Sequence, residues 1–71
     1  MQQVFDRISP TRYIVMRNGS RWEPAPGEGD IVMAWERDAK VQIRGPFLPS
    51  GWNYQLTNLD TGETITARKD E

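Results

Sequence analysis

Apolar and polar residues alternate along most of this chain, which is the pattern of half-buried β-strands. No segment keeps the apolar period of about 3.6 residues that an amphipathic helix of three turns would show. Turn-forming residues recur at intervals of about ten positions, the spacing expected of a small sandwich or barrel. The pattern therefore predicts an all-β fold of five or six short antiparallel strands, in a small barrel or sheet with little or no helix.

The clearest unit is a hairpin over residues 13–23, with Asn18 and Gly19 at its turn. Asn-Gly favours a two-residue type I′ turn, because both turn positions need positive φ and these two residues adopt it readily. Such a loop pairs Val15 with Trp22, and side chains two positions apart share a face. One apolar face of this hairpin would then hold Tyr13, Val15 and Trp22, and the opposite face Ile14, Met16 and Arg21.

The strongest strand signal covers residues 30–36, where apolar residues recur at every second position. A second strand is expected over residues 40–44. A three-residue loop between these strands keeps the apolar residues of both on one face, whereas a two-residue loop would place them on opposite faces. We therefore expect a hairpin that pairs Trp35 with Val41 and Met33 with Ile43.

The C-terminal part predicts another hairpin, with strands over residues 52–57 and 63–68 and a turn over residues 59–62. Its first strand would turn Trp52, Tyr54 and Leu56 inward, and its second Ile65 and Ala67. Residues 2–8 fit either a strand or a short helical turn, and their alternation does not decide between the two. We expect residues 69–71 to fray, as chain ends commonly do.

Two stretches rich in proline and glycine connect these units. Residues 24–29 cannot form an interior strand, because prolines lack a donor, and they are interpreted as a linker rather than a binding loop. Residues 45–51 differ because Phe47 and Leu48 stand between prolines. These two side chains either close one end of the core or form an apolar tip presented to a partner, and the sequence leaves both alternatives open. We favour an SH3-like barrel, because the Pro-Gly-rich approach to residues 29–32 resembles the second strand of such barrels.

Composition restricts the function. The 71 residues fit one small β domain, residues 1–71, and they include three tryptophans but no histidine and no cysteine. The chain thus lacks the usual nucleophile, the usual proton-transfer group and the usual ligands of zinc. Paired carboxylates occur at residues 28–38, but so small a domain has little room for a catalytic cleft. We expect no enzyme, no catalytic residue, no cofactor and no metal site.

No stretch resembles a signal peptide or a membrane span, because the longest apolar run covers only residues 31–35, against about 20 residues for a span. We therefore expect a cytoplasmic protein with no membrane partner. Without a disulfide or a metal, the stability of the fold must come from its large apolar side chains.

Tryptophan and arginine are enriched at the centres of protein interfaces. The leading hypothesis is a non-catalytic binding module that docks on a larger protein or complex as an adaptor, modulator or inhibitor. A homodimer is a further candidate, because the second sheet face also carries apolar residues. Such a short chain would also suit an accessory protein of a phage or mobile element. The candidate partner-binding residues are Arg21, Trp22, Arg44, Phe47, Leu48 and Trp52.

The alternative is a nucleic-acid-binding small β-barrel that uses the arginine-rich N-terminal hairpin. Residues 1–22 carry four arginines against one aspartate, and small barrels bind single strands through aromatic side chains and a basic groove. The net charge of −1 opposes this alternative, since nucleic-acid-binding domains are usually basic. Its candidate residues are Arg12, Tyr13, Arg17, Arg21 and Trp22.

Overall fold

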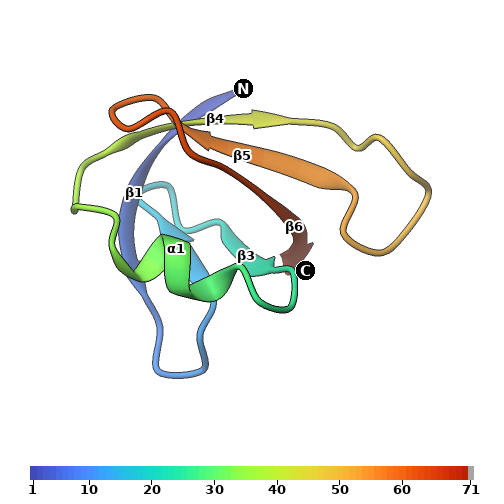
Figure 1. The fold of residues 1–71 in the computed structure, drawn as a ribbon, viewed down its shortest axis with the longest axis horizontal. Helices are drawn as coiled ribbons and strands as arrows, with labels where there is room; N and C mark the ends of the chain where they lie inside the picture. The colour runs from blue at the N-terminus through green and yellow to red at the C-terminus, as the bar shows by residue number, and fades with distance from the viewer. Residues whose placement is uncertain (71) are drawn as a thin grey trace.

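The computed structural model describes residues 1–70, whose six strands pair into a closed antiparallel barrel in the order β1-β2-β3-β6-β5-β4 (Figure 1). One five-residue helix, α1 (Gly29–Met33), follows β3 in the chain. The prediction of an all-β fold with antiparallel strands and little helix is confirmed. The strands are β1 (Gln2–Ile8), β2 (Ile14–Met16), β3 (Arg21–Pro24), β4 (Lys40–Arg44), β5 (Tyr54–Asn58) and β6 (Thr64–Asp70).

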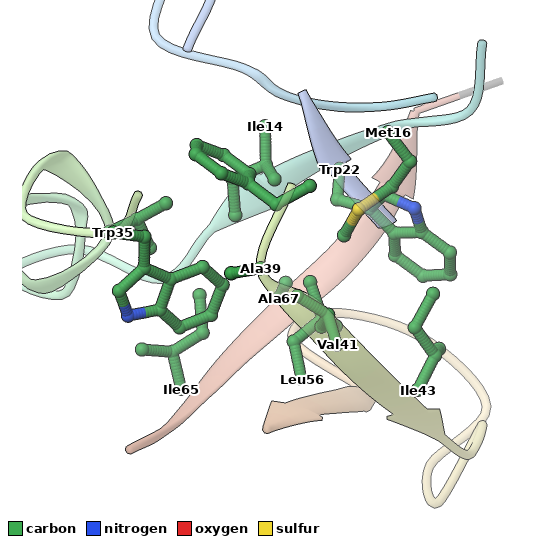
Figure 2. Packing of buried hydrophobic residues seen from close by; sticks show 12 residues of the cluster. Ile14, Met16, Trp22, Trp35, Ala39, Val41, Ile43, Leu56, Ile65 and Ala67 are labelled. Carbon is green, nitrogen blue, oxygen red and sulfur yellow. The ribbon is translucent and has the colours of Figure 1, made fainter. Parts of the chain in front are cut away.

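The barrel interior is filled by one cluster of buried apolar side chains, in which Trp22 and Trp35 are the largest. Figure 2 shows these two indoles on opposite sides of the cluster, with smaller aliphatic side chains between them. The Trp22 ring packs edge-on against Tyr54, with centroids 4.9 Å apart, and Phe5 packs in the same way on Trp35 at 5.8 Å. Two of the three indoles are therefore core residues. The other members of the cluster are Ile14, Met16, Val32, Ala39, Val41, Ile43, Leu56, Ile65 and Ala67.

The β2–β3 hairpin forms, but with a register one residue away from the predicted one. Ile14 pairs with Trp22 and Val15 with Arg21, where the sequence predicted that Val15 pairs with Trp22. The loop has three residues, because the Met16 N–H donates to the Ser20 carbonyl at 2.9 Å. Since a shift of one residue exchanges the faces of a strand, Ile14 and Met16 point inward with Trp22. The predicted apolar face of Tyr13, Val15 and Trp22 is therefore wrong.

The physical reason lies in the turn itself. Only Gly19 has positive φ (88°), so the turn is not type I′, which needs positive φ at Asn18 as well. Instead, the Asn18 side chain accepts a hydrogen bond from the Ser20 N–H at 2.9 Å. Asn18 thus stabilises a three-residue loop with glycine at its left-handed position, a common alternative hairpin connection.

The predicted strand over residues 30–36 is wrong, because this segment begins with α1. Val32 and Trp35, which lie about one turn apart, are 0% and 6% exposed, whereas Met33 is 63% exposed. Short apolar runs fit both a helix and a strand, so periodicity alone could not decide. The pairing of β4 explains the outcome: β4 has β1 on one edge and β5 on the other, which leaves no edge for a strand from residues 30–36. The predicted pairs of Trp35 with Val41 and Met33 with Ile43 do not form.

The C-terminal hairpin matches its predicted facing. Leu56 pairs with Ile65 and Tyr54 with Ala67, and Leu56, Ile65 and Ala67 are all buried. The turn over residues 59–62 is stabilised by Asn58, whose Oδ1 accepts the Asp60 N–H at 2.9 Å. Strand β5 begins at Tyr54, later than predicted, so Trp52 belongs to the preceding loop. The expectation that Trp52 points inward is wrong, because its side chain lies outside the buried cluster.

Both chain ends take part in the barrel. Residues 2–8 form β1, which pairs with both β2 and β4, so the strand alternative is confirmed over the helical turn. Strand β6 runs to Asp70, which pairs with Arg21, while Lys69 pairs with Trp22. The expectation that Lys69 and Asp70 fray is therefore wrong, because they close the barrel against β3. The last position of that expectation, Glu71, lies outside the described residues.

The segment between β3 and α1 is attached to β6. The Ala25 N–H donates to the Thr66 carbonyl at 2.9 Å, and the Glu28 carboxylate accepts the Thr66 N–H at 3.1 Å and also contacts the Thr66 hydroxyl. These bonds fix the start of α1 against the barrel. Within residues 1–70, no helix has the length and hydropathy needed to cross a membrane.

The placement of α1 predicts opposite effects at two neighbouring positions. Val32→Ala removes buried methyl groups and should lower the free energy of unfolding by about 1–3 kcal/mol. Met33→Ala removes a mostly exposed side chain and should leave that free energy nearly unchanged. Urea denaturation followed by tryptophan fluorescence measures both. A greater loss for Met33→Ala would contradict the helix, since the alternating strand would have buried Met33.

Candidate functional site

The loop between β4 and β5 presents two adjacent large apolar side chains to solvent. Phe47 and Leu48 are each 59% exposed. Figure 1 shows this loop extending away from the barrel beyond the ends of the two strands. Of the two alternatives left open by the sequence, the core plug is excluded, because neither side chain packs into the buried cluster. Phe47 and Leu48 are therefore an exposed apolar pair on this loop, called the loop tip below.

Hydrogen bonds within the loop hold this tip in place. The Phe47 N–H donates to the Asn53 carbonyl at 2.7 Å, and the Asn53 side-chain amide donates to the Leu48 carbonyl at 3.2 Å. At the loop base, Gly45 has φ 123°, and a Cβ there would lie 2.7 Å from the Asn53 carbonyl oxygen. Only glycine fits this close approach. A loop that is ordered before binding loses less conformational entropy when a partner docks.

Trp52 lies half-buried at the side of the same loop. The Arg68 guanidinium stacks over its ring at 4.7 Å, and Arg68 is in turn paired with Glu23 at 2.8 Å. This contact links the loop to β6. Arg44, which is exposed, ends β4 where the loop begins. Four of the six predicted partner-binding residues therefore belong to one structural unit: Arg44, Phe47, Leu48 and Trp52.

The remaining two predicted residues, Arg21 and Trp22, are not part of that unit. Trp22 is 1% exposed and cannot contact a partner in the folded barrel. Arg21 stacks over the Tyr13 ring at 4.7 Å and pairs with Asp70 at 3.3 Å. Neighbouring side chains of β3 point to opposite faces, so Trp22 faces the barrel interior and Arg21 faces solvent.

The five residues predicted to bind nucleic acid are affected by the burial of Trp22 and by contacts with other side chains. Trp22 is removed from the surface, and Tyr13 is covered on one face by Arg21. Arg17 contacts Asp38 directly and lies 3.9 Å from Asp6. Among the described residues, Arg12 is the member of this set that forms neither an ion pair nor a stacking contact.

The sequence pattern did not indicate the cluster of charges around Asp6. This carboxylate is 13% exposed and lies 2.7 Å from Arg7, 3.0 Å from Arg37 and 3.9 Å from Arg17. Burial alone would raise the pKa of Asp6, but the hydrogen bond from Arg7 and the charge and hydrogen bond of Arg37 outweigh it. The pKa of Asp6 therefore lies below its usual value of 3.8. Arg7 follows Asp6 in the chain, whereas Arg17 and Arg37 reach it because β1 pairs with β2 and with the segment before β4.

A groove beside α1 was also missed, because the sequence predicted a strand there. It has a volume of about 510 Å³ and lies between the β1–β2 turn and the helix. Ile8, Met33 and Trp35 are among its apolar lining residues, and Arg7, Arg12 and Arg37 are its cationic ones. No signal in the sequence could reveal it without the position of the helix.

No protein-family model matches this sequence, and neither the curated proteins nor the solved structures include a significant match. Among residues 1–70, no three acidic side chains gather in a way that could hold a metal ion. The candidate site therefore rests on the geometry of the β4–β5 loop.

The charge cluster predicts a pH-dependent stability. Because the pKa of Asp6 is lowered on folding, its contribution to the free energy of unfolding is fully present above the unfolded value of 3.8 and is lost as the pH falls through the lower folded value. Asp6→Asn should therefore destabilise the protein at pH 7, and this loss should shrink below pH 3.8. Urea denaturation at a series of pH values measures the difference.

The matched control is Asp60→Asn, which removes an exposed carboxylate that forms no ion pair within residues 1–70. This variant should follow the wild-type pH dependence. If the loss caused by Asp6→Asn were the same at pH 7 and below pH 3.8, the ion-pair cluster would not be its cause.

Proposed function

We propose that this chain is a non-catalytic binding module that docks on a larger protein or complex, as an adaptor, modulator or inhibitor, through the tip of the β4–β5 loop. One observation carries the proposal: Phe47 and Leu48 are adjacent, each 59% exposed, and held at the tip of a hydrogen-bonded loop. Single exposed apolar residues are ordinary on protein surfaces, but a pair at a structured tip is typical of an interaction site.

The surroundings of the tip suggest the chemistry of the partner. Phe47 and Leu48 fit an apolar pocket, and full burial of each contributes about 1.5–3 kcal/mol. Trp52 and Arg44 flank them, and both residue types are enriched at the energetic centres of interfaces. The exposed guanidinium of Arg44 favours a partner with acidic side chains around that pocket.

The test uses the double variant Phe47→Ala/Leu48→Ala. It should weaken partner binding by about a hundredfold or more, because it removes both apolar anchors, while the thermal unfolding midpoint stays close to that of the wild type. Capture from a lysate of the source cells, quantified by mass spectrometry, identifies the partner. Titration calorimetry with the purified partner then gives the affinity.

The control is Leu59→Ala, which removes an apolar side chain of similar size and exposure (46%) from the β5–β6 turn. It should capture the partner as well as the wild type does. The proposal would be refuted if the double variant captured its partners as well as the wild type does. It would also be refuted if the wild type captured no protein that the double variant loses.

The nucleic-acid alternative has weaker support. Arg12 is exposed and offers a guanidinium for phosphate, but Trp22 is buried and Arg17 and Arg21 already contact aspartates. We expect little affinity for single-stranded DNA or RNA in fluorescence polarisation at physiological salt. Tight binding that falls steeply with salt, and that Arg12→Gln reduces, would favour the alternative instead.

Several finer expectations stay predictions alongside this proposal. They are a cytoplasmic location, an SH3-like connectivity, formation of a homodimer, and an origin as an accessory protein of a phage or mobile element. The homodimer has its own physical basis: a second copy could cover the exposed Phe47 and Leu48 in place of a different protein. Sedimentation of the wild type and the double variant would separate these two occupants.

A further inference from the structure

The groove between the β1–β2 turn and α1 combines apolar side chains with guanidinium groups. Its volume is about 510 Å³, and its lining includes Ile8 from β1, the 63% exposed Met33 from α1, and Arg12 from the turn. Figure 1 shows the β1–β2 turn projecting from one end of the barrel beside the helix, well separated from the β4–β5 loop. The groove is therefore a surface distinct from the loop tip.

Arg12 occupies a backbone position that favours glycine. The turns Ser9–Tyr13 and Met16–Ser20 have the same pattern: the first N–H donates to the fifth carbonyl, and the fourth N–H to the first carbonyl. Gly19 holds the fourth position of one turn with φ 88°, whereas Arg12 holds it in the other with φ 68°. A bulky residue in this left-handed region is strained, and such strain concentrates at functional sites.

Arg12 also forms no ion pair with the residues that the structure describes. Arg7 and Arg37, the other two guanidinium groups of the groove, both contact Asp6. Glu23 and Asp30 line an adjoining hollow with Arg12, yet neither forms an ion pair with it. Arg12 thus presents a guanidinium that no carboxylate among residues 1–70 neutralises. Arginine binds a carboxylate through two parallel hydrogen bonds, so a carboxylate complements this guanidinium.

We propose that this groove binds a segment of a protein partner that carries a carboxylate next to large apolar side chains. The carboxylate pairs with Arg12, and the apolar side chains pack on Ile8 and Met33. A protein segment fits better than a nucleic acid, because bases stack on exposed aromatic faces and both aromatic side chains that line the groove, Phe5 and Trp35, are buried. The module would then have two docking surfaces, at the loop tip and at this groove.

The variant Arg12→Gly makes a sharp test because it separates binding from folding. Glycine suits the left-handed φ, so the thermal unfolding midpoint should be unchanged or higher. The probe is a displayed library of random peptides of about a dozen residues, selected on the wild-type protein. We expect enriched peptides that combine acidic and large apolar residues, and Arg12→Gly should weaken them by about tenfold to a hundredfold.

Two further variants complete the test, with affinities measured by fluorescence polarisation on the enriched peptides. Met33→Ala should weaken binding by about tenfold, because it removes the exposed apolar side chain. Lys40→Gln also removes one positive charge but does not line the groove, and should leave the affinity unchanged.

Four outcomes would overturn the proposal: no enriched peptide, enriched peptides without acidic residues, equal binding by Arg12→Gly and the wild type, or equal losses for Lys40→Gln and Arg12→Gly. A single-stranded oligonucleotide that binds in an Arg12-dependent manner and displaces the peptides would assign the groove to nucleic acid instead. If Arg12→Gly loses peptide binding but still captures the partner of the loop tip, both proposals are supported. If the peptides bind Arg12→Gly as well as the wild type, only the groove proposal fails.

Discussion

Closure of the barrel is the constraint on which the rest of the molecule depends. Strand β6 pairs with β3, and β1 pairs with β4, so each strand has a neighbour on both sides. The segment after β3 therefore has no strand edge to join, and its apolar residues reach the core from α1 and from the turn after it, through Val32 and Trp35 respectively. Closure also fixes Trp22 against Tyr54. The position of α1, the groove beside it and the loss of Trp22 from the surface all follow from it.

Local signals in the sequence were enough where neighbouring strands form a hairpin with a single plausible register. The alternation around Leu56 and Ile65 therefore placed the C-terminal hairpin correctly. It failed by one residue at Asn18 and Gly19, because this dipeptide suits two loop lengths. For Phe47 and Leu48, the sequence left a core plug and an exposed tip as equal alternatives. The groove could not be predicted without knowing that residues 30–36 begin as a helix. Long-range pairing, which alternation does not encode, decided these cases.

The same limit applies to charge. Along the chain, arginines concentrate before residue 22 and acidic residues after it, which suggests a basic N-terminal hairpin. In space, Asp38 contacts Arg17 and Asp70 contacts Arg21, so carboxylates from later segments neutralise the earlier arginines. Among the four arginines before residue 22, only Arg12 forms no ion pair within residues 1–70, so these arginines do not make a basic face. A surface of this kind discriminates one carboxylate better than it attracts a long polyanion.

The exposed side chains that carry both proposals lie on connections between strands, Phe47 and Leu48 on the β4–β5 loop and Arg12 and Met33 on the β1–β2 turn and α1, which separates binding from stability. The side chains of Phe47 and Leu48 contribute little to the core. Gly45 and the backbone hydrogen bonds to Asn53 hold the loop in place without these side chains. The chain provides its own comparison, because the turns Ser9–Tyr13 and Met16–Ser20 share one hydrogen-bond pattern. Gly19 holds the left-handed fourth position of one turn, and Arg12 holds it in the other. Arginine at the equivalent position works against folding, so the reason for Arg12 lies in what its guanidinium can bind.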